Sequence, residues 1–250
     1  MNVGAAFRGA RPGVRKPGLR NDPAQYDELA DEWWKPRGAF AALRWLAVAR
    51  AALVPPAPRP GAVLLDVACG GGVLGPHLQG TGYVHVGVDL SATATRVAHK
   101  HGMRYVLRGD VNALPFPDVF ADVVVAGEIL EHVPDLSTAV AECCRVLRPG
   151  GTLVVDTIAD TLLARVLAIS VLEHLPGGPP RNLHDPALLV NRQALLDECT
   201  RHGVRMNLSG LWPSLPDALG WFAGRRLGVR MVPIRSTAVL FQGVGVKEVA

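Results

Sequence analysis

The chain has 250 residues, of which 49% are hydrophobic and 19% charged, so it can bury a sizeable core and is not disordered as a whole. The formal net charge of +4 comes from residues 1–20, which hold five arginines and lysines and no acid. The remaining chain is near neutral, and a few basic residues without interleaved aromatics do not indicate a nucleic-acid-binding protein.

The first region in chain order, residues 1–22, is predicted to be a disordered basic tail. It contains Gly and Pro and lacks hydrophobic periodicity. Because it has no apolar core segment, it does not match a secretory signal, and we expect a cytoplasmic protein. Four cysteines whose spacing fits neither a zinc module nor a disulfide framework agree with a reducing compartment.

Residues 23–60 are predicted to form an N-terminal helical cap followed by a linker. The stretch 24–53 has the apolar spacing of two helices, interrupted near 35–38. The sequence VPPAPRPG at 54–61 is rich in proline and stiff, which is typical of a linker. The main domain is therefore expected to span residues 61–250.

Strand and helix patterns alternate after the linker. This alternation indicates parallel strand–helix units with both faces of the sheet covered. A strand near 203–210 and the terminal run 236–247 complete the expected α/β fold, a Rossmann-like, mostly parallel sheet of seven strands with helices on both faces. The other five strands are predicted from near-continuous apolar runs at 62–68, 84–90, 104–110, 121–127 and 152–158.

Acidic residues stand at the ends of four successive predicted strands. Ligands of parallel sheets bind beyond the carboxyl ends of the strands, so these side chains are expected to meet at one edge. Any one of them alone could be a helix cap or a solvated turn residue, but four together indicate a binding site. They are Asp66, Asp89, Asp110 and Glu128.

The chemistry of this edge suits a cationic nucleoside. Asp66 would favour a positively charged ligand, and Asp89 can accept hydrogen bonds from both hydroxyls of a ribose. Asp110 can accept one from the exocyclic amine of adenine, with Val111 beside the ring. A nucleoside that carries both a positive charge and an amine is S-adenosylmethionine, which we expect to be the cofactor.

The glycine turn after the first strand leaves a second interpretation open. Gly70, Gly72 and Gly75 also match the G-x-G-x-x-G pattern of dinucleotide sites, and Asp89 follows Gly70 by nineteen residues. A nicotinamide-dependent oxidoreductase is therefore one alternative, although Asp66 would repel a pyrophosphate. A protein that binds the cofactor without turnover is another.

Four stretches resemble class I S-adenosylmethionine-dependent methyltransferases over residues 62–158. They are LLDVACGGG, GVDLS, RGDVNALPFPDVFADVVVAGEILEHV and LRPGGTLVVDT. The flanks YDELADEWW (26–34) and LPGGPPRNLHDPALLVNRQALLDECTRHG (175–203) are similar, more narrowly, to the ubiquinone-pathway O-methyltransferases, such as polyprenyl-hydroxyphenol methylases and demethylubiquinol O-methyltransferases. That family methylates polyprenylated phenols and catechols. Its insertion after the fifth strand corresponds here to residues 159–187.

The resemblance implies a set of cofactor contacts. Gly70 and Gly72 would lie under the methionine part of the cofactor, and Gly127 and Glu128 would lie beside its sulfonium. The expected cofactor-binding residues are Asp66, Ala68, Gly70, Gly72, Asp89, Leu90, Asp110, Val111, Gly127 and Glu128.

Two other residues stand out in the same region of the resemblance. Arg37 would reach the methionine carboxylate or the substrate, unless it is an ordinary surface-turn residue. Asp156 stands in the fifth strand, where the resemblance implies a small polar residue.

The implied reaction is methyl transfer to the oxygen of a phenol or catechol, with a polyprenylated quinone precursor as one candidate acceptor. A phenol has a pKa near 10, so ionising it at neutral pH costs roughly 4 kcal/mol. A general base or a divalent metal would offset this cost. His132 and His184 are the candidate catalytic residues. Methylation of a natural product or an amine remains an alternative.

The stretch GEILEHV (127–133) suggests a metal site. Glu128, Glu131 and His132 have spacings that place them on one face of a helix. Two carboxylates and an imidazole could hold a divalent metal such as Mg²⁺ or Zn²⁺, which would be a second cofactor. The alternative is that His132 only packs and hydrogen-bonds at the start of a helix.

Residues 161–175 are predicted to form an apolar helix within the insertion. The stretch is too short for a transmembrane span and contains Arg165 and Glu173. It is either a lid packed on its own domain or an interfacial helix that dips into a bilayer to collect a prenylated substrate. In the second case the protein would touch the membrane peripherally, helped by the basic tail.

Overall fold

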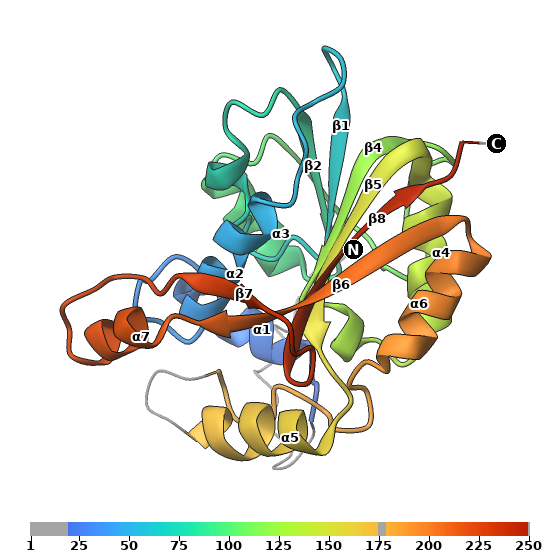
Figure 1. Ribbon diagram of the computed structural model, residues 1–250. Coiled ribbons are helices and arrows are strands. Elements are labelled where there is room, and N and C mark those ends of the chain that lie inside the picture. Colours follow the sequence, from blue (N-terminus) through green and yellow to red (C-terminus); the bar gives the residue numbers. More distant parts are fainter. Residues whose placement is uncertain (1–19, 175–178, 250) are drawn as a thin grey trace, which may run out of the picture.

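One sheet of eight strands forms the centre of the molecule (Figure 1). The computed structural model describes residues 20–174 and 179–249. The strands are β1 (Val63–Val67), β2 (Val84–Asp89), β3 (Tyr105–Arg108), β4 (Ala121–Gly127), β5 (Leu147–Ile158), β6 (Val204–Pro213), β7 (Met231–Ile234) and β8 (Leu240–Lys247).

The strand order is β3-β2-β1-β4-β5-β8-β6-β7. Strands β1 to β5 pair in parallel, whereas β8, β6 and β7 join the sheet antiparallel. This confirms the predicted Rossmann-like sheet and adds one strand to the expected seven. The extra strand, β7, has only four residues and contains Pro233, so its apolar run is too short and too interrupted to predict a strand. A proline is tolerated there because β7 is an edge strand.

Helices cover both faces of the sheet, as predicted. They are α1 (Ala24–Glu28), α2 (Ala41–Ala51), α3 (Ala92–Lys100), α4 (Leu136–Val146), α5 (Leu162–Ala164), α6 (Arg192–Arg201) and α7 (Leu215–Phe222). Shorter turns are the 3-10 helices η1 (Ala30–Glu32), η2 (Gly75–Leu78), η3 (Leu130–His132) and η5 (Leu172–His174) and the π-helix η4 (Arg165–Val171).

The two apolar faces of each central strand explain this layering. Successive residues of a strand point to opposite faces. In β4, Val124 and Ala126 join the core that contains α4 and α6, while Val123 and Val125 join the core that contains α2. The continuous apolar runs of the sequence are therefore a consequence of burial on both sides.

The N-terminal cap, α1 through α2, packs directly on the sheet. Its rings form a stack, with centroid distances of 5.6 Å between Tyr26 and Phe40 and 4.5 Å between Trp33 and Phe40. Trp33 and Phe40 are buried in the same core as the strand residues Leu64 and Val125. The cap is thus a wall of the main domain.

The segment 161–174 is helical but irregular, since α5 continues as a π-helix and a 3-10 turn. Its Ala164, Ala168 and Ile169 are buried against Ile158 and Leu189, as expected of a lid on its own domain. The residues Leu162, Leu163, Val166 and Leu172 nevertheless remain exposed. Among the residues that the structure describes, no helix has the length and apolarity to cross a membrane.

A hairpin that the sequence did not predict projects from the sheet between β6 and β7 (Figure 1). We call residues 214–230, which include α7, the α7 hairpin. Arg37 braces it by donating hydrogen bonds to the carbonyl oxygens of Trp221 and Arg226. Arg37 thus anchors the hairpin in this structure, and its contact with the cofactor or substrate stays a prediction.

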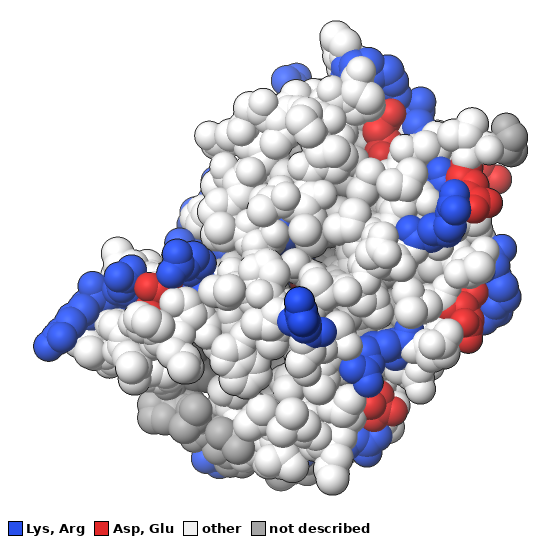
Figure 2. Space-filling view, viewed as in Figure 1, with Lys and Arg blue, Asp and Glu red and all other residues white. Residues whose placement is uncertain are grey.

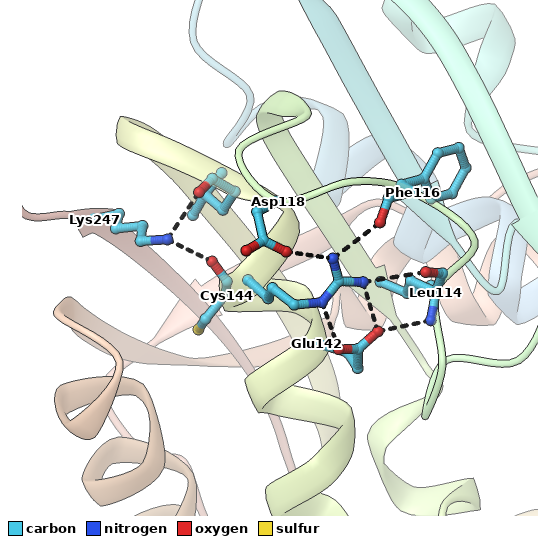
Figure 3. A network of polar contacts seen from close by, with 8 residues as sticks. Leu114, Phe116, Asp118, Glu142, Cys144 and Lys247 are labelled. Atoms are coloured by element: carbon cyan, nitrogen blue, oxygen red, sulfur yellow. Dashed lines mark hydrogen bonds and ion pairs between the residues drawn. The ribbon is translucent and has the colours of Figure 1, made fainter.

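Arg145 ties the connection between β3 and β4 to α4 (Figure 3). Its guanidinium pairs with Glu142 at 2.6 Å and Asp118 at 2.8 Å, and it donates to the carbonyl oxygens of Leu114 and Phe116. This network holds a loop that begins at Asp110, next to the predicted adenine site.

The predicted tail, residues 1–22, lies mostly outside the described residues. Its last part is placed: Arg20 donates to the carbonyl oxygen of His184 at 3.0 Å, and Asn21 contacts His132. These contacts correct the predicted boundary, because an arginine and an amide that hold two candidate site residues belong to the domain. All four cysteines are free and buried.

Candidate active site

A cavity of about 850 Å³ opens at the carboxyl ends of the parallel strands. This volume lies within the range of about 300–1000 Å³ that is common for small-molecule sites. The N-terminal cap, the segment 161–174 and the α7 hairpin complete its wall. Eight of the ten predicted cofactor residues line it, namely Asp66, Ala68, Asp89, Leu90, Asp110, Val111, Gly127 and Glu128.

Asp89 is fixed at the end of β2 by the backbone of two turns. Its carboxylate oxygens accept hydrogen bonds from the backbone N–H of Gly70 and of Ser91, each at 2.8 Å. Burial raises its pKa, although these hydrogen bonds act against that shift. Asp66, at the end of β1, lies 3.2 Å from His85 Nε2. Both acids are thus held in place on the cavity wall.

The glycine turn is covered by protein, which differs from the prediction. A Cβ on Gly70 or Gly71 would collide with the ring of Trp33, and one on Gly72 would press on Ala98. Gly70 and Gly72, with φ of +52° and +77°, are needed for the turn itself and for these close approaches. Neither lines the cavity, whereas their neighbour Ala68 does.

A buried ion pair that the sequence did not predict joins the cap to the sheet. Arg50 of α2 donates two hydrogen bonds of 2.6 Å to the carboxylate of Asp156 in β5. The guanidinium lies against Gly127, where any side chain would collide with it. Asp156 was the feature of the sequence that could have indicated this ion pair, because a charge within a buried strand requires a partner. The sequence could not say which arginine provides it.

Glu128 follows β4 in a left-handed conformation, with a φ of +51°. Such backbone is costly outside glycine and is concentrated at functional sites. Its Oε1 is buried and has no hydrogen-bond partner among the described residues. Burial, and then repulsion from Glu131 and Asp156, raises its pKa well above the usual value. An unsatisfied acceptor on the cavity wall fits a ligand that carries donors or a positive charge.

His132 is oriented by two residues of the N-terminal segment. Asn21 donates from its amide nitrogen to the carbonyl oxygen of His132 at 2.9 Å, so its oxygen accepts from His132 Nδ1–H at 2.6 Å. His132 Nε2 is then unprotonated and accepts from the Tyr26 hydroxyl at 3.2 Å. Burial, and then the proximity of His184, lowers the pKa of His132 to about 3, so its ring is neutral at pH 7.

His184 is held by a carboxylate in a similar way. Its Nδ1 donates to Glu173 Oε1 at 3.0 Å, so the carboxylate fixes the orientation of the ring. Burial opposes ionisation of Glu173, yet hydrogen bonds from His184 and Asn182 lower its pKa overall. Glu173, like Tyr26 and Asn21, has a role at the site that its position in the sequence did not reveal.

A candidate metal centre is formed by Glu131, His132 and His184. One ligand atom from each lies within 4.8 Å of the others. Glu131 is fully buried; its Oε2 accepts from the Thr157 hydroxyl at 2.7 Å, and its Oε1 has no hydrogen-bond partner among the described residues. Ligands about 2.1 Å from an ion lie at most about 4.2 Å apart, so a small contraction would let the cluster hold a metal.

This cluster differs from the predicted metal ligands Glu128, Glu131 and His132. Residues 128–132 do not form an α-helix, since only the 3-10 turn η3 is present and Glu128 has a positive φ. The face that helical spacing would create is therefore absent. His184 takes the third place in the cluster, brought there by the insertion after β5.

Comparisons with known proteins agree with this geometry. Residues 65–155 match the family model described as a methyltransferase domain. A ubiquinone biosynthesis O-methyltransferase of Thiobacillus denitrificans is 35% identical over 67% of this chain and 75% of its own length. One from Ralstonia nicotianae is 33% identical over 70% of this chain and 77% of its own.

Solved structures show the same fold. An S-adenosylmethionine-dependent methyltransferase of Thermotoga maritima matches with a TM-score of 0.61 and 18% identity, covering 89% of this chain and 98% of its own. The alternative of a nicotinamide-dependent oxidoreductase is left without support. Eight of the predicted cofactor residues share one cavity wall, and the chain belongs to the ubiquinone biosynthesis O-methyltransferase family and is an S-adenosylmethionine-dependent O-methyltransferase.

Proposed function

We propose that the acceptor is a phenol or catechol that carries an apolar chain, such as a polyprenylated quinone precursor. The observation that carries this proposal is the composition of the cavity. Its wall combines acids at the strand ends with apolar side chains from the insertion, β6 and the α7 hairpin, including Leu167, Leu172, Trp212 and Phe222. The names of the curated relatives point to the same class of acceptor.

The cofactor would be held by the strand ends. Asp89 would accept from the ribose hydroxyls, Asp110 would accept from the adenine amine beside Val111, and Glu128 would face the positive part of the ligand. Of the described residues on the wall, Arg50 alone carries a guanidinium or ammonium group, so it suits the methionine carboxylate. S-adenosylmethionine supplies the electrophilic methyl group, and the residues of this chain position it against the acceptor.

Removing the acceptor's proton is the step that the cluster of Glu131, His132 and His184 would assist. A phenol has a pKa near 10, whereas the pKa of His132 is about 3. Transfer of the phenol proton to His132 would therefore cost roughly 10 kcal/mol. Burial raises the pKa of Glu131 to about 7, but Glu131 is not part of the cavity wall. Two imidazoles and a buried carboxylate match the ligands of a divalent metal such as Mg²⁺ or Zn²⁺. Such an ion would lower the pKa of a bound hydroxyl.

A methyl-acceptor screen tests the proposed acceptor and the metal separately. Labelled methyl transfer would be measured on catechols, phenols and prenylated quinols, with and without EDTA. We expect the highest kcat/KM for prenylated catechols and phenols, and a loss of rate in EDTA that added Mg²⁺ restores. Transfer only to amines would overturn the acceptor class, and a rate unchanged by EDTA would overturn the metal.

We also propose that the segment 161–174 touches a membrane peripherally, because Leu162 and Leu163 are exposed to solvent. The double variant Leu162→Glu/Leu163→Glu should sediment less with phospholipid vesicles than the parent. Val119→Glu, an exposed position before the amino end of β4, is the matched control. Equal sedimentation of all three proteins would contradict the proposal.

A further inference from the structure

The α7 hairpin exposes a second apolar surface, separate in sequence from the segment 161–174. The side chains of Leu215, Leu219 and Leu227 are 65%, 71% and 71% exposed, and Phe222 is also exposed. Large apolar residues are rarely this exposed together without an interaction partner. The surface therefore requires a partner that accepts apolar side chains.

Positive charge surrounds these apolar residues. The stretch 212–236 contains four arginines and one carboxylate, that of Asp217. Asp217 is buried and lies 3.1 Å from Arg226 and 3.5 Å from Arg230, so it neutralises only part of the charge. Figure 2 shows basic side chains along the lobe that Figure 1 identifies as the α7 hairpin. The other two arginines of this stretch, Arg225 and Arg235, are both exposed.

The hairpin is held in an outward position by its opposite face. Trp221 is buried, with its ring 5.2 Å from that of Trp45 in α2, and Arg37 lies 5.1 Å over the Trp221 ring. Arg37 also donates to backbone carbonyl oxygens of the hairpin. Because Trp221 fixes one side of α7, Leu215 and Leu219 cannot fold back onto the domain.

We infer that the α7 hairpin inserts into the surface of an anionic lipid bilayer. Its leucines would enter the acyl boundary while its arginines meet the headgroups. Two copies of this surface would repel each other, so the charge favours an anionic membrane over a homodimer. The hairpin and the segment 161–174 both contribute to the cavity wall, so a prenylated acceptor could pass between them from the bilayer. This last point rests on the proposed function.

Vesicle co-sedimentation of the full chain tests the inference. The probes are phosphatidylcholine vesicles with and without phosphatidylglycerol. Leu219→Glu/Leu227→Glu and Arg225→Glu/Arg235→Glu should each lower partitioning onto the anionic vesicles by roughly tenfold or more. Val119→Glu, an exposed position before the amino end of β4, should leave it unchanged. Circular dichroism would check folding. Both hairpin variants should fold like the parent, because each changes only exposed side chains.

Several outcomes would overturn the inference. These are absence of binding by the parent protein, equal binding to both vesicle types, or unchanged binding by both hairpin variants. A parent that dimerises in sedimentation velocity, with the leucine variant monomeric and no vesicle binding, would assign the surface to a second copy instead.

Activity separates this inference from the proposed function. Leu219, Leu227, Arg225 and Arg235 do not line the cavity, so their variants should methylate a short catechol without a prenyl chain at the parental rate. If the parent binds anionic vesicles but methylates no phenol or catechol, the proposed acceptor fails while the membrane contact stands.

Discussion

At the scale of single residues, ionisable side chains on the cavity wall and directly behind it are buried and have few hydrogen-bond partners. Arg50 and Asp156 satisfy each other, whereas Glu128 and Glu131 each keep one buried oxygen without a hydrogen-bond partner among the described residues. Burial of an unsatisfied acceptor costs free energy, so such groups persist where a ligand compensates them.

Asp89 should be required for cofactor binding. Asp89→Ala removes the acceptor expected to bind two ribose hydroxyls, and hydrogen bonds to a charged group contribute about 1.5–3 kcal/mol each. We expect the affinity for S-adenosylhomocysteine, measured by titration calorimetry, to fall about 100-fold or more. Asp197→Ala, an exposed position in α6, should leave it unchanged. Parental affinity in Asp89→Ala would place the ribose elsewhere.

The pair of Arg50 and Asp156 should show strong coupling in stability. Asp156→Ala leaves a buried guanidinium without its counter-charge, which should lower the free energy of unfolding by about 3 kcal/mol or more. The double variant Arg50→Met/Asp156→Ala should recover most of this loss in urea unfolding. Glu248→Ala, which breaks the exposed pair with Arg205, serves as the control. Additive losses would contradict the coupling.

At the scale of elements, the strand ends place the predicted cofactor residues, and the turns decide where those side chains point. The end of β4 illustrates this. The sequence after it has helical spacing, but only η3 forms, and Glu128, with its positive φ, interacts with Asp156 and Arg50 as well as with Glu131. The connection between β3 and β4 is set in the same way, by Arg145.

Arg145 should stabilise the connection between β3 and β4. Arg145→Met removes hydrogen bonds to Glu142 and to the carbonyl oxygens of Leu114 and Phe116, so we expect a loss of about 2 kcal/mol of stability. Amide exchange should increase across residues 110–120. Arg148→Met, which removes a single bond to a backbone carbonyl, is the control. A protection pattern identical to the parent would show that the loop is held by other contacts.

At the scale of the whole molecule, the site is assembled from segments that are far apart in sequence. The N-terminal segment provides Asn21 and Tyr26, the turn after β4 provides His132, and the insertion provides Glu173 and His184. Formation of the cluster therefore depends on complete folding, and its ionisation is coupled to global stability.

Global stability should depend on pH through Glu131. Its folded pKa of about 7 is above the ordinary glutamate pKa of 4.5, so its contribution is fully present below pH 4.5 and is lost as the pH rises through 7. Glu131→Gln, in EDTA, should therefore gain about 3 kcal/mol relative to the parent between pH 4.5 and pH 8, measured by urea unfolding. The titration of His132 contributes equally to the stability of both proteins and cancels in the difference. A stability difference that does not change with pH would contradict the raised pKa.

Much of the fold and part of the site could be predicted from the sequence. The strands β1 to β5 coincide with the five predicted runs, and the acids at the ends of β1, β2 and β3 place Asp66, Asp89 and Asp110 on one cavity wall. The edge strand β7 and the α7 hairpin gave no such signal, because short elements with proline and glycine have no period to detect.

The sequence by itself determined the parallel sheet, its two covered faces and the acids that line the cavity, because these depend on local periodicity and on the rule that strand ends meet at one edge. Only the tertiary structure decided that Trp33 covers the glycine turn, that Arg50 pairs with Asp156, and that His184 replaces Glu128 beside Glu131 and His132. Each of these contacts joins segments that are separated by many residues. Their geometry follows from packing and burial, which no local pattern of residues encodes.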